Sequence, residues 1–177
     1  MANHRIFCQS LLLGLLIALS LPFGVAAEME LDDKQAGFLL KALSYDRNAA
    51  RRYGDDVHLL IVYDGAENKD DAGQIGDIFR KNGSGGVSGK PLKVEQESFT
   101  TVAKLLKKID DEGVDVVYIH HSLQRAMSSV QQVTRSRKKL SLCGSKEMVE
   151  RGTSLGVYLY NGNPKVAVNL RAAKVEG

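Results

Sequence analysis

The stretch HLLIVY at residues 58–63 decides the fold class. After its first residue it holds only apolar side chains and one tyrosine, over the length of a single strand. A continuous apolar run of this length is typical of a strand that is covered on both faces, as in parallel sheets. A second run of the same kind, VDVVYI, follows at 114–119. The two runs predict central strands whose buried residues include Leu60, Val62, Val117 and Ile119.

Helical patterns alternate with the strands. Asp32-Asp33 can cap a helix over 34–51, with an apolar face made of Phe38, Leu39, Ala42, Leu43 and Tyr45. Three later stretches, within 72–79, 102–109 and 123–133, also carry apolar residues at helical spacing. Further strands are predicted at 92–99, 140–143, 155–160 and 165–170, the last two joined by the turn NGNP at 161–164.

This alternation predicts the arrangement of the layers. Strands that alternate with helices form βαβ units with right-handed crossovers. We therefore expect an α/β fold: a three-layer αβα sandwich with a mainly parallel sheet of βαβ units and a C-terminal antiparallel hairpin. A chain of 177 residues has room for one such domain, which we place at 28–177.

Composition excludes several classes of function. A net charge of +3 and 6% aromatic residues argue against a nucleic-acid partner. Two cysteines exclude a disulfide-rich scaffold and a cysteine-only zinc site. No nucleophile elbow or zinc-protease motif occurs, and Ser84 stands where the first glycine of a phosphate loop belongs. We expect no enzymatic activity, no cofactor and no bound metal.

The first residues have the layout of an export signal. Arg5 precedes an uncharged, leucine-rich run at 6–25, and small residues stand at 25–27 before Glu28. This is the pattern of a cleavable signal peptide at 1–27 that directs the chain to the periplasm, with an uncleaved membrane anchor as the alternative. The mature chain would be peripheral to the membrane at most. It would keep one cysteine, Cys143, so no intramolecular disulfide can form.

Several polar residues follow predicted strands. The carboxyl ends of parallel strands meet at one edge of a sheet, where ligands collect in open α/β folds. The candidate ligand-binding residues at this edge are Asp64, Thr100, Thr101, His120, His121 and Ser122. Small hydroxylated residues at such places also serve as helix caps and turns, which is the competing interpretation.

The pair His120-His121 has two interpretations. Neighbours on a strand point to opposite faces, so one ring would be buried and the other would face solvent. If the strand ends at Ile119, both rings lie in the loop at the ligand edge, where they could hold a transition metal ion or carry a proton. No Asp, Glu or Cys directly adjoins the pair to support a metal.

The C-terminal third carries a family resemblance. The segments 148–152, 155–159 and 164–174, which closes in Asn-Leu-Arg-Ala-Ala at 169–173, resemble the end of the YfiR/HmsC-like family of exported bacterial proteins. The segment 38–48 resembles the N-terminal helix of one branch, and the resemblance covers about 32–177. Two features depart from the family: its usual leucine-rich final helix is missing after Gly177, and so are its disulfide cysteines.

The resemblance implies regulation. Members bind the external sensing domain of an inner-membrane partner, typically a diguanylate cyclase, and hold it inactive; a histidine kinase is a further possible partner. The rival interpretation is a single-lobe periplasmic small-molecule (solute)-binding protein, since one lobe of a solute-binding protein has the same order of elements. Without the final helix, apolar surface beside the strand at 165–170 favours a homodimer, unless the helix at 34–51 covers it.

Overall fold

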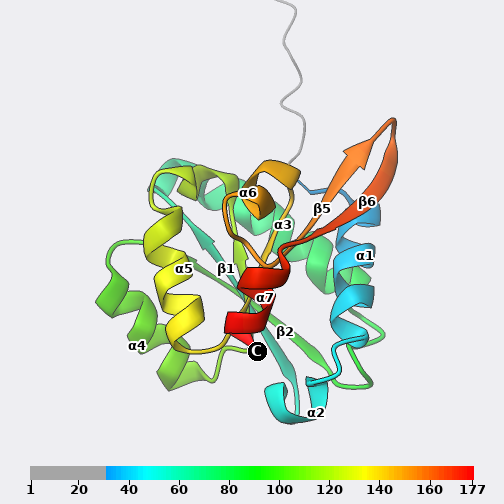
Figure 1. Ribbon diagram of the computed structural model, residues 1–177, viewed down its shortest axis with the longest axis horizontal. Helices are drawn as coiled ribbons and strands as arrows, with labels where there is room; N and C mark the ends of the chain where they lie inside the picture. Colours follow the sequence, from blue (N-terminus) through cyan, green and yellow to red (C-terminus); the bar gives the residue numbers. More distant parts are fainter. Residues whose placement is uncertain (1–30) are drawn as a thin grey trace, which may run out of the picture.

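The computed structural model describes residues 31–177. A six-stranded sheet forms its middle layer, in the order β2-β1-β3-β4-β5-β6 (Figure 1). Strands β1 to β5 are parallel, and β6 runs antiparallel to β5. This confirms the expected α/β sandwich and its C-terminal hairpin. The strands are β1 (Val57–Tyr63), β2 (Leu92–Ser98), β3 (Val116–Ile119), β4 (Leu140–Cys143), β5 (Leu155–Tyr160) and β6 (Asn163–Val168).

Helices cover both faces of the sheet (Figure 1). On one face, α1 (Asp33–Ser44) and α3 (Lys69–Asn82) share an apolar core with Leu59 and Ile61 of β1. On the other, α4 (Val102–Glu112) and α5 (Met127–Ser136) share a second core with Leu60 and Val62. The remaining elements are short: α2 (Ala49–Arg52), α6 (Lys146–Glu150), α7 (Leu170–Glu176) and the 3-10 helices η1 (Ala66–Asn68) and η2 (His121–Gln124).

The central strands are buried as predicted. Leu60, Val62, Val117 and Ile119 have no exposed surface. Each strand has a neighbour on both sides, with Leu60 paired to Val117 and Val117 paired to Ser141. Cys143 is also fully buried.

The predicted helix over 34–51 is wrong in its extent and in part of its face. Asp32 caps α1 as expected, in a capping box with Gln35, but the helix ends at Ser44 and α2 is separate. The Asp46 carboxylate accepts the backbone N–H of Asn48 at 2.8 Å, which favours a turn over a continuing helix. Phe38 and Tyr45 are 44% and 74% exposed, so they do not belong to the buried face.

Two other boundaries differ from the prediction. Asn161 and Gly162 both have left-handed backbone and form a two-residue turn, so Asn163 and Pro164 pair with β5. The last strand therefore occupies 163–168, because Asn169 already caps α7 through its side chain. The helical pattern at 123–133 is likewise divided, with Leu123 in η2 and α5 beginning at Met127.

A buried carboxylate anchors α7. Glu176 has no exposed surface and accepts hydrogen bonds from Thr134 Oγ1 at 2.7 Å and from the backbone N–H of Ser141 at 2.8 Å. The hydroxyls of Ser141 and Ser154 also donate to it, at 2.8 and 2.5 Å. Four donors from α5, β4 and the start of β5 thus surround one side chain, which compensates for the loss of its hydration.

The hairpin of β5 and β6 stands out from the body of the domain, beside α1 (Figure 1). Helix α1 covers one face of it, where Gln35 Nε2 donates to the backbone oxygen of Val157. The expected cover by this helix is therefore present over part of the hairpin. Exposed apolar side chains remain along both strands and at the start of α7: Leu159, Tyr160, Val166, Val168 and Leu170. Self-association through this edge stays a prediction.

Within residues 31–177, no helix combines the length and hydropathy needed to cross a bilayer. The predicted signal peptide at 1–27 lies outside the described residues.

Candidate functional site

The carboxyl ends of β1 and β3 are tied together at one edge of the sheet. Beyond β3, the backbone N–H of His120 donates to the carbonyl of Val62 in β1. Beyond β1, the backbone N–H of Asp64 donates to Ser122 Oγ at 2.9 Å. The expectation that Asp64, His120 and Ser122 lie at one edge is therefore confirmed, and main-chain hydrogen bonds fix their backbone.

His120 is the centre of this edge. Its side chain is fully buried, and its two ring nitrogens have different partners. Nδ1 lies 2.8 Å from Ser122 Oγ and also accepts the backbone N–H of Ser122 at 3.2 Å. Nε2 lies 2.9 Å from Asp71 Oδ2. The ring is thus held from both sides, and a proton on Nε2 satisfies both contacts.

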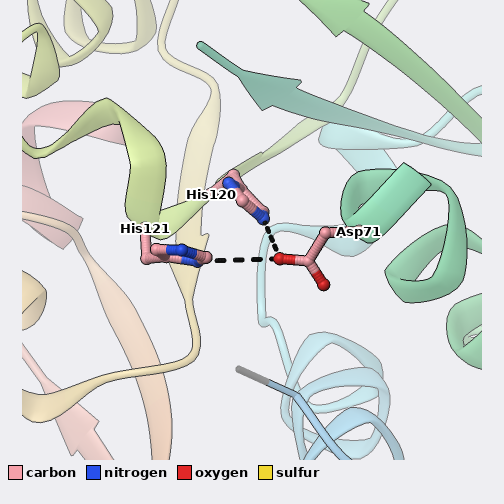
Figure 2. A group of neighbouring side chains, drawn as sticks. All are labelled: Asp71, His120 and His121. Atoms are coloured by element: carbon pink, nitrogen blue, oxygen red, sulfur yellow. Dashed lines mark hydrogen bonds and ion pairs between the residues drawn. The ribbon is translucent and has the colours of Figure 1, made fainter. Parts of the chain in front are cut away.

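Figure 2 shows that His121 points at the same carboxylate as His120. Its Nδ1 is 4.0 Å from Asp71 Oδ2, and the centroids of the two imidazole rings are 4.2 Å apart. The strand ends at Ile119, and His121 begins the 3-10 helix η2, so the alternation that separates strand neighbours no longer applies. The end of the strand at Ile119 agrees with the second interpretation of the histidine pair, whereas the burial, with His120 enclosed and His121 48% exposed, is that of the first.

Asp71 was missed by the sequence analysis. It lies in the first turn of α3, 49 residues before His120, and its side chain is 36% exposed. An acidic residue in the first turn of a helix is ordinarily explained by the helix dipole. The only sequence signal was its place just after the turn that follows the first central strand, on the same edge as the histidines.

Thr101 and Thr100 contribute less to this site. Thr101 Oγ1 accepts the backbone N–H of Lys104, so the side chain caps α4, which was the competing interpretation of this residue. Thr100 is exposed just after β2. Because β1 separates β2 from β3, both threonines lie at the far end of the edge from His120.

A second group of ligand-type side chains lies on the α4 face: His58, Glu95 and Glu112. Lys108 Nζ is 2.9 Å from Glu95 and 2.5 Å from Glu112. The hydrogen bond of Glu95 with Glu112, together with the ammonium groups of Lys93 and Lys108, holds the pKa of Glu95 well below its usual range. Since the Lys108 ammonium already bridges the two carboxylates, we interpret this group as an ion-pair network.

A wide cavity of about 940 Å³ lies away from the histidines. It is formed at the amino ends of β4 and β5, where Leu140 and Leu155 line it, between α2 and α7. Its position differs from the predicted ligand edge. Its basic lining residues are Arg47, Arg51, Arg52, Arg137, Lys138, Lys139 and Lys174.

The comparisons with known proteins concern the fold. No protein-family model and no curated protein matches the sequence. A solved structure of an ABC domain in complex with L-Trp, from Streptococcus pneumoniae, is similar with a TM-score of 0.56 and 14% identity, over 80% of this chain and 55% of that one. A substrate-binding protein with adhesive properties from Clostridium difficile, in its ligand-free open form, is similar with a TM-score of 0.51 and 16% identity, over 78% of this chain and 53% of that one.

A conserved domain protein from Vibrio cholerae is similar with a TM-score of 0.50 and 14% identity, over 67% of this chain and 49% of that one. The chain thus spans about half the length of the solved proteins that it resembles. At these identities the likeness establishes a shared α/β architecture.

Proposed function

We propose that this chain is an exported binding domain that holds a small polar solute at the carboxyl edge of its sheet. The observation that carries the proposal is that Asp64 and His120 lie where the strand order of the sheet reverses. In open α/β sheets, ligands bind where the strand order reverses. Here it reverses at β1, which lies between β2 and β3, and Asp64 and His120 directly follow β1 and β3. The likeness to a substrate-binding protein and to an ABC domain solved in complex with L-Trp supports the same class of function.

The side chains at this edge suit a free amino acid. Asp64 and Asp71 offer carboxylates to an ammonium group. The Ser122 hydroxyl, engaged by His120 and by the backbone N–H of Asp64, positions these residues, and Thr100 farther along the edge offers a hydroxyl donor to a carboxylate. His121, whose side chain is 48% exposed, offers a further polar contact beside Asp71. The proposal concerns the single lobe that residues 31–177 form.

Amino-acid binding is expected to stabilise the folded chain. We predict that at least one of the twenty free amino acids, offered singly and beginning with L-Trp, raises the melting temperature. A ligand at about 100 times its Kd adds roughly 2.7 kcal/mol to the free energy of unfolding, which corresponds to several degrees. Ser122→Ala should reduce the shift, whereas Arg51→Gln, in the basic cavity, should leave it unchanged. No shift with any amino acid, or a shift lost only in Arg51→Gln, would contradict this site.

Regulation of a membrane partner is the second candidate function. It is favoured by the resemblance of 164–174 to YfiR/HmsC-like proteins and by the exposed apolar residues of the β5–β6 hairpin. The partner would be the periplasmic sensing domain of an inner-membrane diguanylate cyclase or histidine kinase, which the bound domain represses. A homodimer through β6 would use the same surface, and export with cleavage after Ala27 is part of both proposals.

Regulation of a diguanylate cyclase has a cellular readout. Deleting the gene is expected to raise the level of cyclic di-GMP, because the partner loses its repressor. The wild-type gene should restore the low level, and a variant with both Val166→Lys and Val168→Lys should not, since the charges disrupt the apolar surface. An unchanged level in the deletion strain would contradict a cyclase partner.

A further inference from the structure

We propose that Asp71, His120 and His121 form a binding site for a divalent transition metal ion, with Zn²⁺ as the best fit. Each side chain offers one ligand atom, and the three atoms lie within 4.8 Å of one another. This inference goes beyond the proposed solute binding and does not depend on it, because it rests on these three side chains alone.

The distances are close to those of a coordination sphere. Zinc bonds to imidazole nitrogen and carboxylate oxygen are about 2.0–2.2 Å long, so tetrahedral ligand atoms lie about 3.3 Å apart. His120 Nε2 is 2.9 Å and His121 Nδ1 is 4.0 Å from Asp71 Oδ2. Both separations are within 1 Å of the required value. His121 can make the larger adjustment, since its side chain is 48% exposed.

The surroundings of His120 provide the outer support that metal-binding histidines have. Such a histidine donates its second ring N–H to an oxygen that fixes the orientation of the ring. Ser122 Oγ lies 2.8 Å from His120 Nδ1, and the backbone N–H of Asp64 donates to that hydroxyl. Without metal, the Nε2 proton binds Asp71. A metal ion at Nε2 requires that proton to move to Nδ1, where it donates to Ser122 Oγ, and the hydroxyl and the backbone N–H of Ser122 then give up Nδ1 as their acceptor.

The types of ligand select the ion. Two imidazoles and one carboxylate suit Zn²⁺ and its neighbours among the transition metals, whereas Mg²⁺ and Ca²⁺ prefer oxygen ligands alone. Three protein ligands leave a fourth position for water or for a donor atom of a bound solute. The group of His58, Glu95 and Glu112 is a weaker candidate, because a metal ion would have to displace the Lys108 ammonium.

The test is a zinc titration of the protein purified as the cell processes it, without a polyhistidine tag and after removal of metal with EDTA. We expect one Zn²⁺ per chain in competition with a chromophoric chelator. Asp71→Asn and His121→Ala should each weaken binding at least ~10-fold. Both positions are partly exposed, so the variants should fold, which circular dichroism checks. Glu112→Gln, in the other group, is the matched control and should bind as the wild type does.

Two results would overturn the zinc site. One is a wild-type protein that takes no zinc from the chelator. The other is equal affinity in the wild type, Asp71→Asn and His121→Ala, which would place the ion elsewhere. The amino-acid panel repeated in EDTA separates the two proposals: a melting shift that persists there supports solute binding whatever the zinc result is.

Discussion

Replacing Val117 by aspartate is expected to lower the free energy of unfolding by about 3–5 kcal/mol. Val117 has no exposed surface and lies in β3, paired to Leu60 on one side and to Ser141 on the other. It belongs to the core shared with α4 and α5. A carboxylate there would lose its hydration without a partner, in a core that is otherwise apolar around it. Urea unfolding followed by circular dichroism measures the loss.

Val166→Asp is the matched control for this substitution. Val166 lies in β6, is 46% exposed, and undergoes the same chemical change without the burial. We expect it to cost less than ~1 kcal/mol, as surface substitutions do. A Val117→Asp variant that melts within about 2 °C of the wild type, which corresponds to under ~1 kcal/mol for a chain of this size, would show that Val117 is not in the central strand.

The central strands were predictable because their signal is local. The run at 59–63 is apolar on both faces, which is typical of a strand covered by helices on both sides. The ends of elements depend on side-chain contacts instead. Beyond Ser44, the Asp46 carboxylate accepts the backbone N–H of Asn48, which favours a turn over more helix. The same apolar spacing that placed Leu39 and Leu43 correctly also included Phe38, which is 44% exposed. The spacing of apolar residues predicts which side of a helix is buried, but it does not predict how many residues around that side are buried.

The candidate site was predictable in one half only. His120, His121 and Ser122 follow a recognisable strand, so the topology alone brings them to the ligand edge. To predict that Asp71 faces the histidines, one must know how α3 is rotated about its axis, and that rotation depends on how Ile75 and Phe79 pack into the core. A residue two positions along that helix would point elsewhere. The metal donor set could therefore not be completed from the sequence, in which no acidic residue adjoins the histidine pair.

Glu176 is the clearest case of a residue whose role the sequence concealed. A charged residue near the end of a short helix is ordinarily solvent-exposed, yet Glu176 has no exposed surface. Its donors come from three elements that are distant in sequence, at Thr134, Ser141 and Ser154. Nothing in the local pattern of α7 distinguishes Glu176 from Lys174, which is exposed on the same helix.

Replacing Glu176 by leucine is expected to cost about 2–5 kcal/mol, because each buried donor left without an acceptor costs roughly 1–3 kcal/mol. Thr134 can turn its hydroxyl to the carbonyl of Gln131, 3.1 Å away. The backbone N–H of Ser141 donates to Glu176 and would lose this acceptor. The hydroxyl of Ser154 would lose the same acceptor. Glu176→Gln should cost less, since one oxygen remains, but its amide N–H₂ then faces groups that are themselves donors.

Urea unfolding of both variants measures the cost, with Lys174→Gln as a control that also removes one charge from α7. The control should stay within about 0.5 kcal/mol of the wild type. A double-mutant cycle of Glu176→Gln with Ser154→Ala should give a coupling energy within the range of roughly 0.5–3 kcal/mol found for residues in one hydrogen-bond network. If Glu176→Gln unfolds at the same urea concentration as the control and the coupling is zero, the carboxylate is not buried among these donors in solution. A measured coupling would instead establish that Glu176 anchors α7 to the start of β5, at one wall of the basic cavity.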